Sequence, residues 1–210
     1  MRDLLEGDSR MRTPLRYQAT EYDCGPTAVL NAITYLYSTE EIPPDFVKAV
    51  YNYCLDEYND LGCPGRHGTS QAAIRFMTEW FNNYARCTGY PLRCEYFQGE
   101  DVHMQDHSQI IACLEHGGAA VVRCILECEH YITLTGIDSE YVHVFDPYFW
   151  DMDFGKKGIV QVTDKPFEMN RKISRNIMDC TDDCDYSFCK TENRTAMLIY
   201  KTGKGKVLLP

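Results

Sequence analysis

Cys24 is the cysteine whose position best suits a nucleophile. It opens a segment in which apolar residues recur at helical spacing, and Pro26 fits the first turn of such a helix. At a helix start, unpaired backbone N–H groups and the positive end of the helix dipole stabilise a thiolate. Gln18 lies six residues upstream, so its side-chain amide could join the Cys24 backbone N–H in binding an oxyanion. The pattern predicts thiol attack on a carbonyl carbon.

A β-hairpin predicts the general base that such a thiol needs. His130–Ile137 and Tyr141–Asp146 are predicted strands, joined by three polar residues with the composition of a turn. Antiparallel pairing around this turn places His130 opposite Asp146 or one of the two residues after it. A carboxylate there can accept a hydrogen bond from one imidazole nitrogen and leave the other nitrogen to face the thiol.

Each of these residues also has an ordinary structural interpretation. Cys24 could merely cap or pack a helix, His130 could be a half-buried imidazole on a strand, and Asp146 could form the turn before a proline. The occurrence of all three together favours the catalytic interpretation. The other histidines lie in polar loops or lack an opposing acid, and they are His67, His103, His107, His116 and His143.

The remaining cysteines are not expected to bind metal. Cys180, Cys184 and Cys189 lie in an Asp-rich stretch, but their spacing is irregular and no histidine follows them. The two cysteines just before His130 also have spacings unlike a zinc knuckle. Small core side chains are expected for four cysteines with apolar neighbours, Cys54, Cys87, Cys113 and Cys124. The sequence therefore predicts no metal ion and no cofactor.

Composition excludes several classes of protein. The 210 residues are 44% hydrophobic, which predicts one packed domain rather than a disordered tail. A formal net charge of −10 argues against binding to nucleic-acid phosphates or anionic lipid. No apolar run approaches the roughly 18 residues of a membrane span, and acids interrupt the opening residues where a signal peptide is apolar. We expect a cytoplasmic protein with no nucleic-acid or membrane partner, and the oligomeric state is left open.

The first half of the chain predicts three helices. The first spans 24–37, the second follows the proline pair at 43–44 and ends before Gly62, and the third is capped by Thr69 or Ser70. The faces expected to be buried are Phe46, Val47, Val50, Tyr51, Cys54, Leu55 and Tyr58 on the second helix and Ile74, Met77, Trp80 and Phe81 on the third.

The second half predicts strands around one short helix. That helix spans 108–115 and is closed by the glycine pair at 117–118. Besides the hairpin, strands are expected at 92–97, 119–126, 158–163 and 195–200, with irregular chain between the last two. Helices followed by an antiparallel sheet predict an α+β fold.

Several motifs, taken together, resemble a known family. They are Gln18-x5-Cys24 within Gln-Ala-Thr-Glu-Tyr-Asp-Cys-Gly-Pro-Thr-Ala, His-Tyr-Ile-Thr-Leu-Thr-Gly-Ile-Asp at 130–138, and Val-Phe-Asp-Pro at 144–147. Over residues 14–150 the sequence resembles the bacteriocin-processing, double-glycine leader peptidases, family thirty-nine of the papain-like cysteine peptidases. The resemblance implies a papain-like fold with N-terminal helices packed on an antiparallel sheet.

The resemblance also implies a role for each matching residue. Cys24 would be the nucleophile, His130 the base, Asp146 the acid that orients it, and Gln18 the oxyanion donor. The best-known family members are fused to a transporter, but no Gly-x4-Gly-Lys-Ser/Thr nucleotide-binding loop occurs in this sequence. Transporter coupling and double-glycine specificity are therefore not carried over.

The expected organisation and activity follow from these observations. Residues 1–13 are predicted to form a flexible arm, 14–150 the peptidase-like domain, and 151–210 an extension that completes the same domain. The predicted protein is a hydrolase that cleaves a peptide or an amide-containing small molecule through a Cys-His-Asp triad. Two alternatives are an acyltransferase that uses the same Cys24 thioester, and an inactive peptide-binding module of the same fold.

Overall fold

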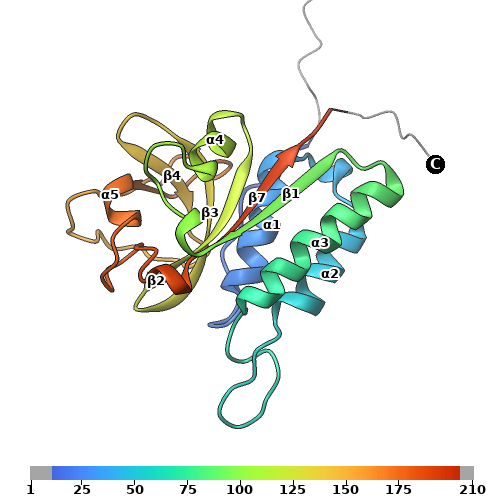
Figure 1. Cartoon of the computed structure of the whole chain (residues 1–210), viewed down its shortest axis with the longest axis horizontal. Coiled ribbons are helices and arrows are strands. Elements are labelled where there is room, and N and C mark those ends of the chain that lie inside the picture. The colour runs from blue at the N-terminus through green and yellow to red at the C-terminus, as the bar shows by residue number, and fades with distance from the viewer. Residues whose placement is uncertain (1–10, 204–210) are drawn as a thin grey trace, which may run out of the picture.

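The centre of the protein is a seven-stranded antiparallel sheet, seen here in a computed structural model that describes residues 11–203. The strands are β1 (Leu92–Gln98), β2 (Ala119–Leu126), β3 (Cys128–Ile137), β4 (Tyr141–Phe145), β5 (Ile159–Gln161), β6 (Arg171–Ser174) and β7 (Thr195–Lys201). The helices are α1 (Cys24–Leu36), α2 (Pro44–Cys54), α3 (Gln71–Thr88), α4 (Gln109–Glu115) and α5 (Arg175–Met178). The strand order is β1-β7-β2-β3-β4-β6-β5, with α1, α2 and α3 grouped on one side and α4 and α5 on the other (Figure 1).

The central strands are buried on both faces because their residues alternate between two apolar cores. Val121 of β2 and Met197 of β7 face the core formed with α1, α2 and α3. Val122 and Leu198, the next residue on each strand, face the core formed with α4 and α5. Strand β7 comes from the end of the described chain, yet it lies between β1 and β2 and contributes to both cores.

Local signals fix the starts of the helices where the sequence predicts them. Pro44 occupies the first turn of α2, where its missing N–H removes no hydrogen bond. The Ser70 side chain accepts a hydrogen bond from the Ala73 backbone N–H at 3.0 Å and so caps α3. Ser108 caps α4 in the same way. The predicted strands at 92–97, 119–126 and 195–200 are confirmed within one residue at each end.

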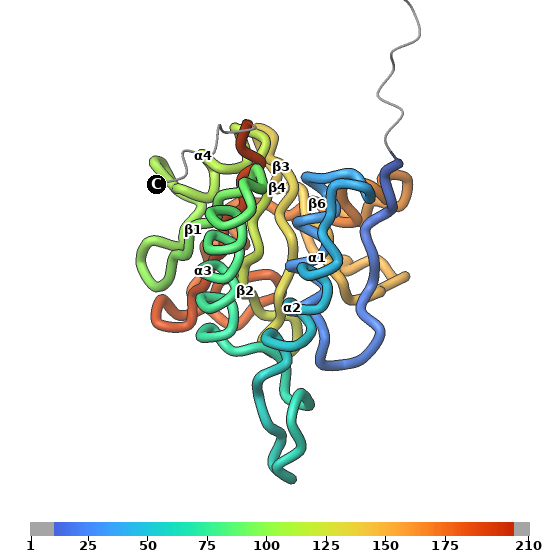
Figure 2. The backbone as a smooth tube through the Cα atoms, turned by 90° about the vertical axis from the view of Figure 1, so that its right-hand side faces the viewer, coloured from blue at the N-terminus to red at the C-terminus, as the bar shows by residue number. Residues whose placement is uncertain are grey.

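The end of α2 differs from the prediction. The sequence predicts a helix that includes Leu55 and Tyr58, but α2 ends at Cys54, and Tyr58 is 64% exposed. The Thr69 hydroxyl donates to the Cys54 carbonyl oxygen at 2.5 Å, so a distant side chain satisfies a helix-end carbonyl. Residues 55–70 instead project from the body of the protein (Figure 2).

Several smaller predictions were also wrong. The stretch before β7, predicted to be irregular, contains β6 and the single-turn helix α5. Its basic residues and short elements carry little periodic signal, and β6 is held by pairing with β4 as well as with the preceding strand β5. Three residues predicted to be buried are exposed, namely Val47, Tyr51 and Cys87, and Trp80 is only half-buried. Most of the predicted arm, residues 1–10, lies outside the described residues.

Within residues 11–203, no helix is both long and apolar enough to cross a membrane.

Candidate functional site

Cys24 is the first residue of α1 and is buried, with 7% of its surface exposed. The preceding residue, Asp23, does not cap α1 with its side chain. Its carboxylate turns back and accepts hydrogen bonds from the Thr20 backbone N–H at 2.7 Å and the Thr20 hydroxyl at 2.8 Å. These hydrogen bonds restrain the conformation of the loop between Gln18 and Cys24. In the described structure, the Asp23 side chain does not cap the first turn of α1. The backbone N–H groups of this turn could therefore stabilise a thiolate.

His130 and Asp146 meet in a buried hydrogen bond of 2.7 Å between Nε2 and Oδ1. His130 lies on the part of β3 that extends beyond its pairing with β4, and Asp146 directly follows β4. The predicted hairpin is confirmed: Thr133 pairs with Phe145, and the register shifts at a bulge nearer the turn. The imidazole Nδ1 is left available on the side of the ring away from the carboxylate.

Electrostatics favour an ionised pair. Burial alone disfavours the imidazolium, but the charge and hydrogen bond of Asp146 and a contact with the Cys24 thiol raise the pKa of His130 to about 10. Burial likewise disfavours the carboxylate, but His130 and the hydrogen-bond donors around it hold the pKa of Asp146 below its usual range. The interaction with Cys24 brings the three residues that the sequence predicts as a triad into one cluster.

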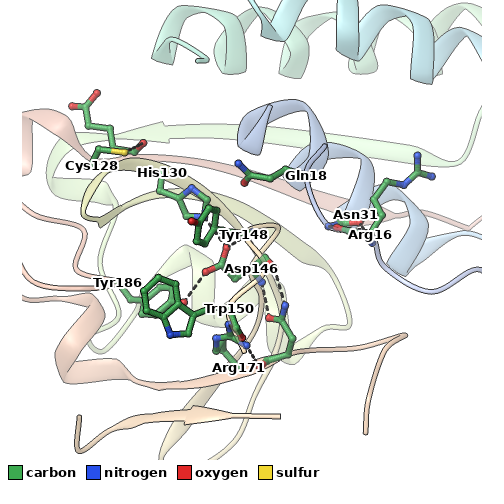
Figure 3. A network of polar contacts seen from close by, with 12 residues as sticks. Arg16, Gln18, Asn31, Cys128, His130, Asp146, Tyr148, Trp150, Arg171 and Tyr186 are labelled. Atoms are coloured by element: carbon green, nitrogen blue, oxygen red, sulfur yellow. Dashed lines mark hydrogen bonds and ion pairs between the residues drawn. The ribbon is translucent and has the colours of Figure 1, made fainter. Parts of the chain in front are cut away.

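Three residues that sequence reasoning missed hold Asp146 in place (Figure 3). The Tyr186 hydroxyl donates to Oδ2 at 2.6 Å, and the Tyr148 backbone N–H donates to Oδ1 at 2.8 Å. Asn170 binds the Asp146 backbone twice, accepting from its N–H and donating to its carbonyl oxygen, both at 2.8 Å. No local pattern marks Tyr186 or Asn170, because each lies more than twenty residues from the acid that it contacts.

Gln18 lies beside the end of β4. Its backbone N–H donates to the Pro147 carbonyl oxygen at 2.8 Å, and its side-chain Nε2 donates to the Thr20 carbonyl oxygen at 2.8 Å. Its Oε1 is buried and has no hydrogen-bond partner among the described residues. Figure 3 shows the amide directed toward His130. One amide hydrogen is thus free for an oxyanion, although no hydrogen bond among residues 11–203 joins Gln18 to Cys24.

The histidine on the next strand lies elsewhere. His143 pairs with Gly136 near the hairpin turn, and its Nε2 lies 3.1 Å from Oδ2 of Asp138. The prediction that His143 lacks an acidic partner was therefore wrong, because the turn residue Asp138 directs its carboxylate back over the strand. His143 belongs to this separate surface pair.

The Asp-rich cysteine segment forms local contacts. Burial and the neighbouring Cys180 thiol raise the pKa of Cys184, and the Cys189 thiol donates to Oδ1 of Asp183 at 2.8 Å. Among the described residues, no group of three or more His, Cys, Asp or Glu side chains is arranged to hold a metal ion.

A model described as the Peptidase_C39 like family matches residues 11–161. The chain belongs to this family. A putative C39-like peptidase from Bacillus anthracis is similar in structure, with 13% identity, a TM-score of 0.50, and coverage of 90% of this chain and 96% of that one. The double glycine motif protease of an AMS/PCAT transporter, solved with its leader peptide, shows 13% identity, a TM-score of 0.44, and coverage of 92% and 94%. No curated protein matches.

The family and the fold agree with the predicted class. The C39-like chain has an α+β papain-like fold, as the sequence resemblance implies. Membership of the family supports a function of the cysteine peptidase type. The roles of individual residues depend on the geometry described above.

Proposed function

We propose that this C39-like protein hydrolyses a peptide or amide bond with Cys24 as nucleophile, His130 as base and Asp146 as orienting acid. The observation that carries the proposal is the buried hydrogen bond of 2.7 Å between His130 and Asp146, on an imidazole that also contacts the Cys24 thiol. A buried base with an orienting acid on one side and a thiol at a helix start on the other is the arrangement that acyl transfer requires.

The proposed reaction has two steps. The Cys24 sulfur, whose proton passes to the His130 imidazole, attacks the carbonyl carbon. The Cys24 backbone N–H and the Gln18 amide bind the resulting oxyanion. The C–N bond then breaks as His130 donates a proton to the leaving amine, which leaves a thioester. His130 next removes a proton from water, which attacks the thioester carbonyl, and the C–S bond breaks to release the acid and regenerate Cys24.

Alkylation tests the nucleophile directly. Native protein is treated with substoichiometric iodoacetamide at pH 6, and adducts are located by peptide mass spectrometry. We expect Cys24 to react ahead of Cys87 and Cys128, although both of these are exposed and Cys24 is buried. The variant His130→Ala should remove this advantage, because the imidazolium no longer stabilises the thiolate. First labelling of an exposed cysteine would refute the assignment.

Hydrolysis rates of substituted proteins distinguish the catalytic roles proposed for the four residues. With a library of fluorogenic peptide amides, Cys24→Ala and His130→Ala should nearly abolish hydrolysis. Asp146→Asn should impair it less, because an amide oxygen can still accept from the imidazole. Gln18→Ala should lower kcat by roughly 10²- to 10³-fold, the usual effect of one oxyanion donor. Near wild-type rates for Gln18→Ala would place the oxyanion donors elsewhere.

Two alternative activities predict different results. An acyltransferase would give a new amide product when a primary amine is added, whereas a hydrolase gives the free acid in water. An inactive binding module would show no preferential alkylation of Cys24 and no turnover. Product analysis with and without added amine therefore decides among all three activities.

A further inference from the structure

A pocket of about 320 Å³ lies next to the candidate site and contains a buried cation. Aromatic residues form much of its wall, and two of its lining residues, Trp150 and Arg171, are drawn in Figure 3. The residues that carry the argument are Tyr17, Phe145, Phe149, Trp150, Asn170 and Arg171. The pocket is thus largely apolar, and Arg171 and Asp151 are its charged lining residues.

Arg171 is 2% exposed and has an incomplete set of hydrogen-bond partners. Its Nη1 donates to the Asn170 carbonyl oxygen at 2.8 Å, and its Nη2 donates to the Trp150 carbonyl oxygen at 3.1 Å. Its Nε is buried without an acceptor, and so is the indole Nε1 of Trp150. Within the described chain, no carboxylate forms an ion pair with this guanidinium. The guanidinium carbon lies 5.5 Å from the centroid of the Phe154 ring, so its near partner is an aromatic ring. Two buried N–H donors therefore lack an acceptor, and the buried positive charge lacks an anion.

Such an arrangement is unusual because buried charges in proteins are normally paired. Two carboxylates lie in the vicinity, but neither supplies the missing partner. Asp151 lines the pocket and is exposed to solvent. Asp146 is bound to His130 and Tyr186. An added carboxylate would supply both the charge and the acceptor atoms that Arg171 lacks.

The pocket shares its walls with the candidate site. Tyr17 and Phe145, which line it and whose rings lie 5.4 Å apart, directly precede Gln18 and Asp146 in the chain. Asn170, which precedes Arg171, binds the Asp146 backbone on both sides. The pocket therefore adjoins two residues of the candidate site, Gln18 and Asp146.

We propose that this pocket is a substrate subsite for a residue that bears a carboxylate on an apolar stem. The aromatic rings would contact the stem, and Arg171 with the Trp150 N–H would bind the carboxylate. The inference rests on the proposed hydrolytic function. Its substrate class is a peptide with an acidic side chain or a free C-terminal carboxylate near the scissile bond.

Binding tests the subsite without any turnover. Full-length Cys24→Ser protein, labelled with ¹⁵N, is titrated with 3-phenylpropanoate and with 3-phenylpropanamide. The chain has two tryptophans, so the indole N–H signal of Trp150 is readily assigned with Trp80→Phe. We expect the acid to shift the Trp150 signal and to bind roughly 10- to 100-fold more tightly than the amide.

Variants of Arg171 and of the adjacent Lys172 provide the controls. Arg171→Gln should remove the preference for the acid, and Arg171→Lys should keep part of it. Lys172→Gln, which changes a partly exposed cation paired with Asp138, should leave the preference unchanged. If Arg171→Gln does not fold, Trp150→Phe removes one proposed donor and should lower the preference several-fold. Equal binding of acid and amide by the Cys24→Ser protein would overturn the proposal.

Cleavage then connects the subsite to the reaction. Matched peptides carry Glu or Gln near the cleaved bond, or end in a carboxylate or an amide, which distinguishes the two sources of the carboxylate. Arg171→Gln should lower kcat/KM for acidic peptides selectively, whereas a merely structural role would lower it for every peptide equally. Acid-selective binding without cleavage would refute the proposed function and leave the subsite standing. Cleavage without preference for an acid would refute the subsite alone.

Discussion

A fully buried carboxylate stays ionised only where its surroundings supply donors and positive charge. Asp146 is 0% exposed, yet it accepts hydrogen bonds from His130, Tyr148 and Tyr186. Burial and the adjacent carboxylate charge raise the pKa of Tyr186, so its hydroxyl remains a donor. The orientation of the proposed base therefore depends on a residue forty positions away in the sequence.

We predict that Tyr186→Phe lowers kcat/KM by about tenfold, because a hydrogen bond to a charged group contributes roughly 1.5 kcal/mol or more. Loss of the donor also raises the pKa of Asp146, so the acid limb of the pH–rate profile should move to higher pH. Tyr90→Phe is the matched control, since the Tyr90 hydroxyl is buried without a partner in the described structure. An unchanged pH profile in Tyr186→Phe would show that Tyr186 only fills space.

The ionised pair also predicts how stability depends on pH. The pKa of His130 is raised from 6.5 to about 10, so its contribution is fully present below pH 6.5 and is lost as pH rises toward 10. The pKa of Asp146 is lowered from 3.8, so its contribution is present above pH 3.8 and is lost as pH falls through the folded-state value. The pair should therefore stabilise the protein most between about pH 4 and 6.5.

The measurement compares unfolding free energies from pH 3 to 10 in two proteins, both carrying Cys24→Ser to remove titration of the thiol. One retains His130 and Asp146, and the other carries His130→Gln with Asp146→Asn. We expect the difference between the two curves to shrink on both sides of the window, with a slope of at most about 1.4 kcal/mol per pH unit for one proton. A constant difference would mean that the pair is uncharged.

At the scale of elements, the sequence predicts structure well where the signal is local. The start of α1, the Ser70 cap of α3 and the turn beginning at Asp138 depend on a few adjacent residues, and all three are as predicted. The end of α2 depends on Thr69, and β6 depends on pairing with β4, which lies further back in the chain than the adjacent strand β5. The same division holds for the site, because His130 and Asp146 belong to one hairpin whereas Tyr186 arrives through tertiary packing.

The contact between α1 and the chain before α3 gives a prediction at this scale. A Cβ added at Gly25 would lie 2.1 Å from Oγ1 of Thr69, closer than atoms can approach. We predict that Gly25→Ala lowers the unfolding free energy by about 1–3 kcal/mol, as overpacking usually does, and slows alkylation of Cys24 by displacing the start of α1.

A second substitution identifies the cause of this effect. Thr69→Gly removes all three Thr69 atoms that the new Cβ would meet, so the double variant should regain part of the alkylation rate lost in Gly25→Ala. Urea unfolding and the rate of iodoacetamide labelling measure the two effects. Additive losses in the double variant would show that Thr69 is not the obstacle.

At the scale of the whole molecule, the end of the chain contributes to both the sheet and the candidate site. Strand β7 separates β1 from β2, and Leu198 and Ile199 on it are fully buried in opposite cores. The Tyr186 hydroxyl comes from the same region. These contacts support the proposal that residues 151–210 complete the domain of residues 14–150, although the family model ends at residue 161.

We therefore predict that a fragment of residues 14–150 does not fold cooperatively. Without β7, strand β1 loses its pairing partner and β2 becomes an unpaired edge, so both cores open at their centre. Urea unfolding followed by far-UV circular dichroism should give no sharp transition for the fragment. In the full chain, Leu198→Ala should cost about 2–5 kcal/mol, whereas Val160→Ala, 43% exposed on the edge strand β5, should cost far less. A cooperative transition in the fragment would make 14–150 an independent domain and 151–210 an accessory segment.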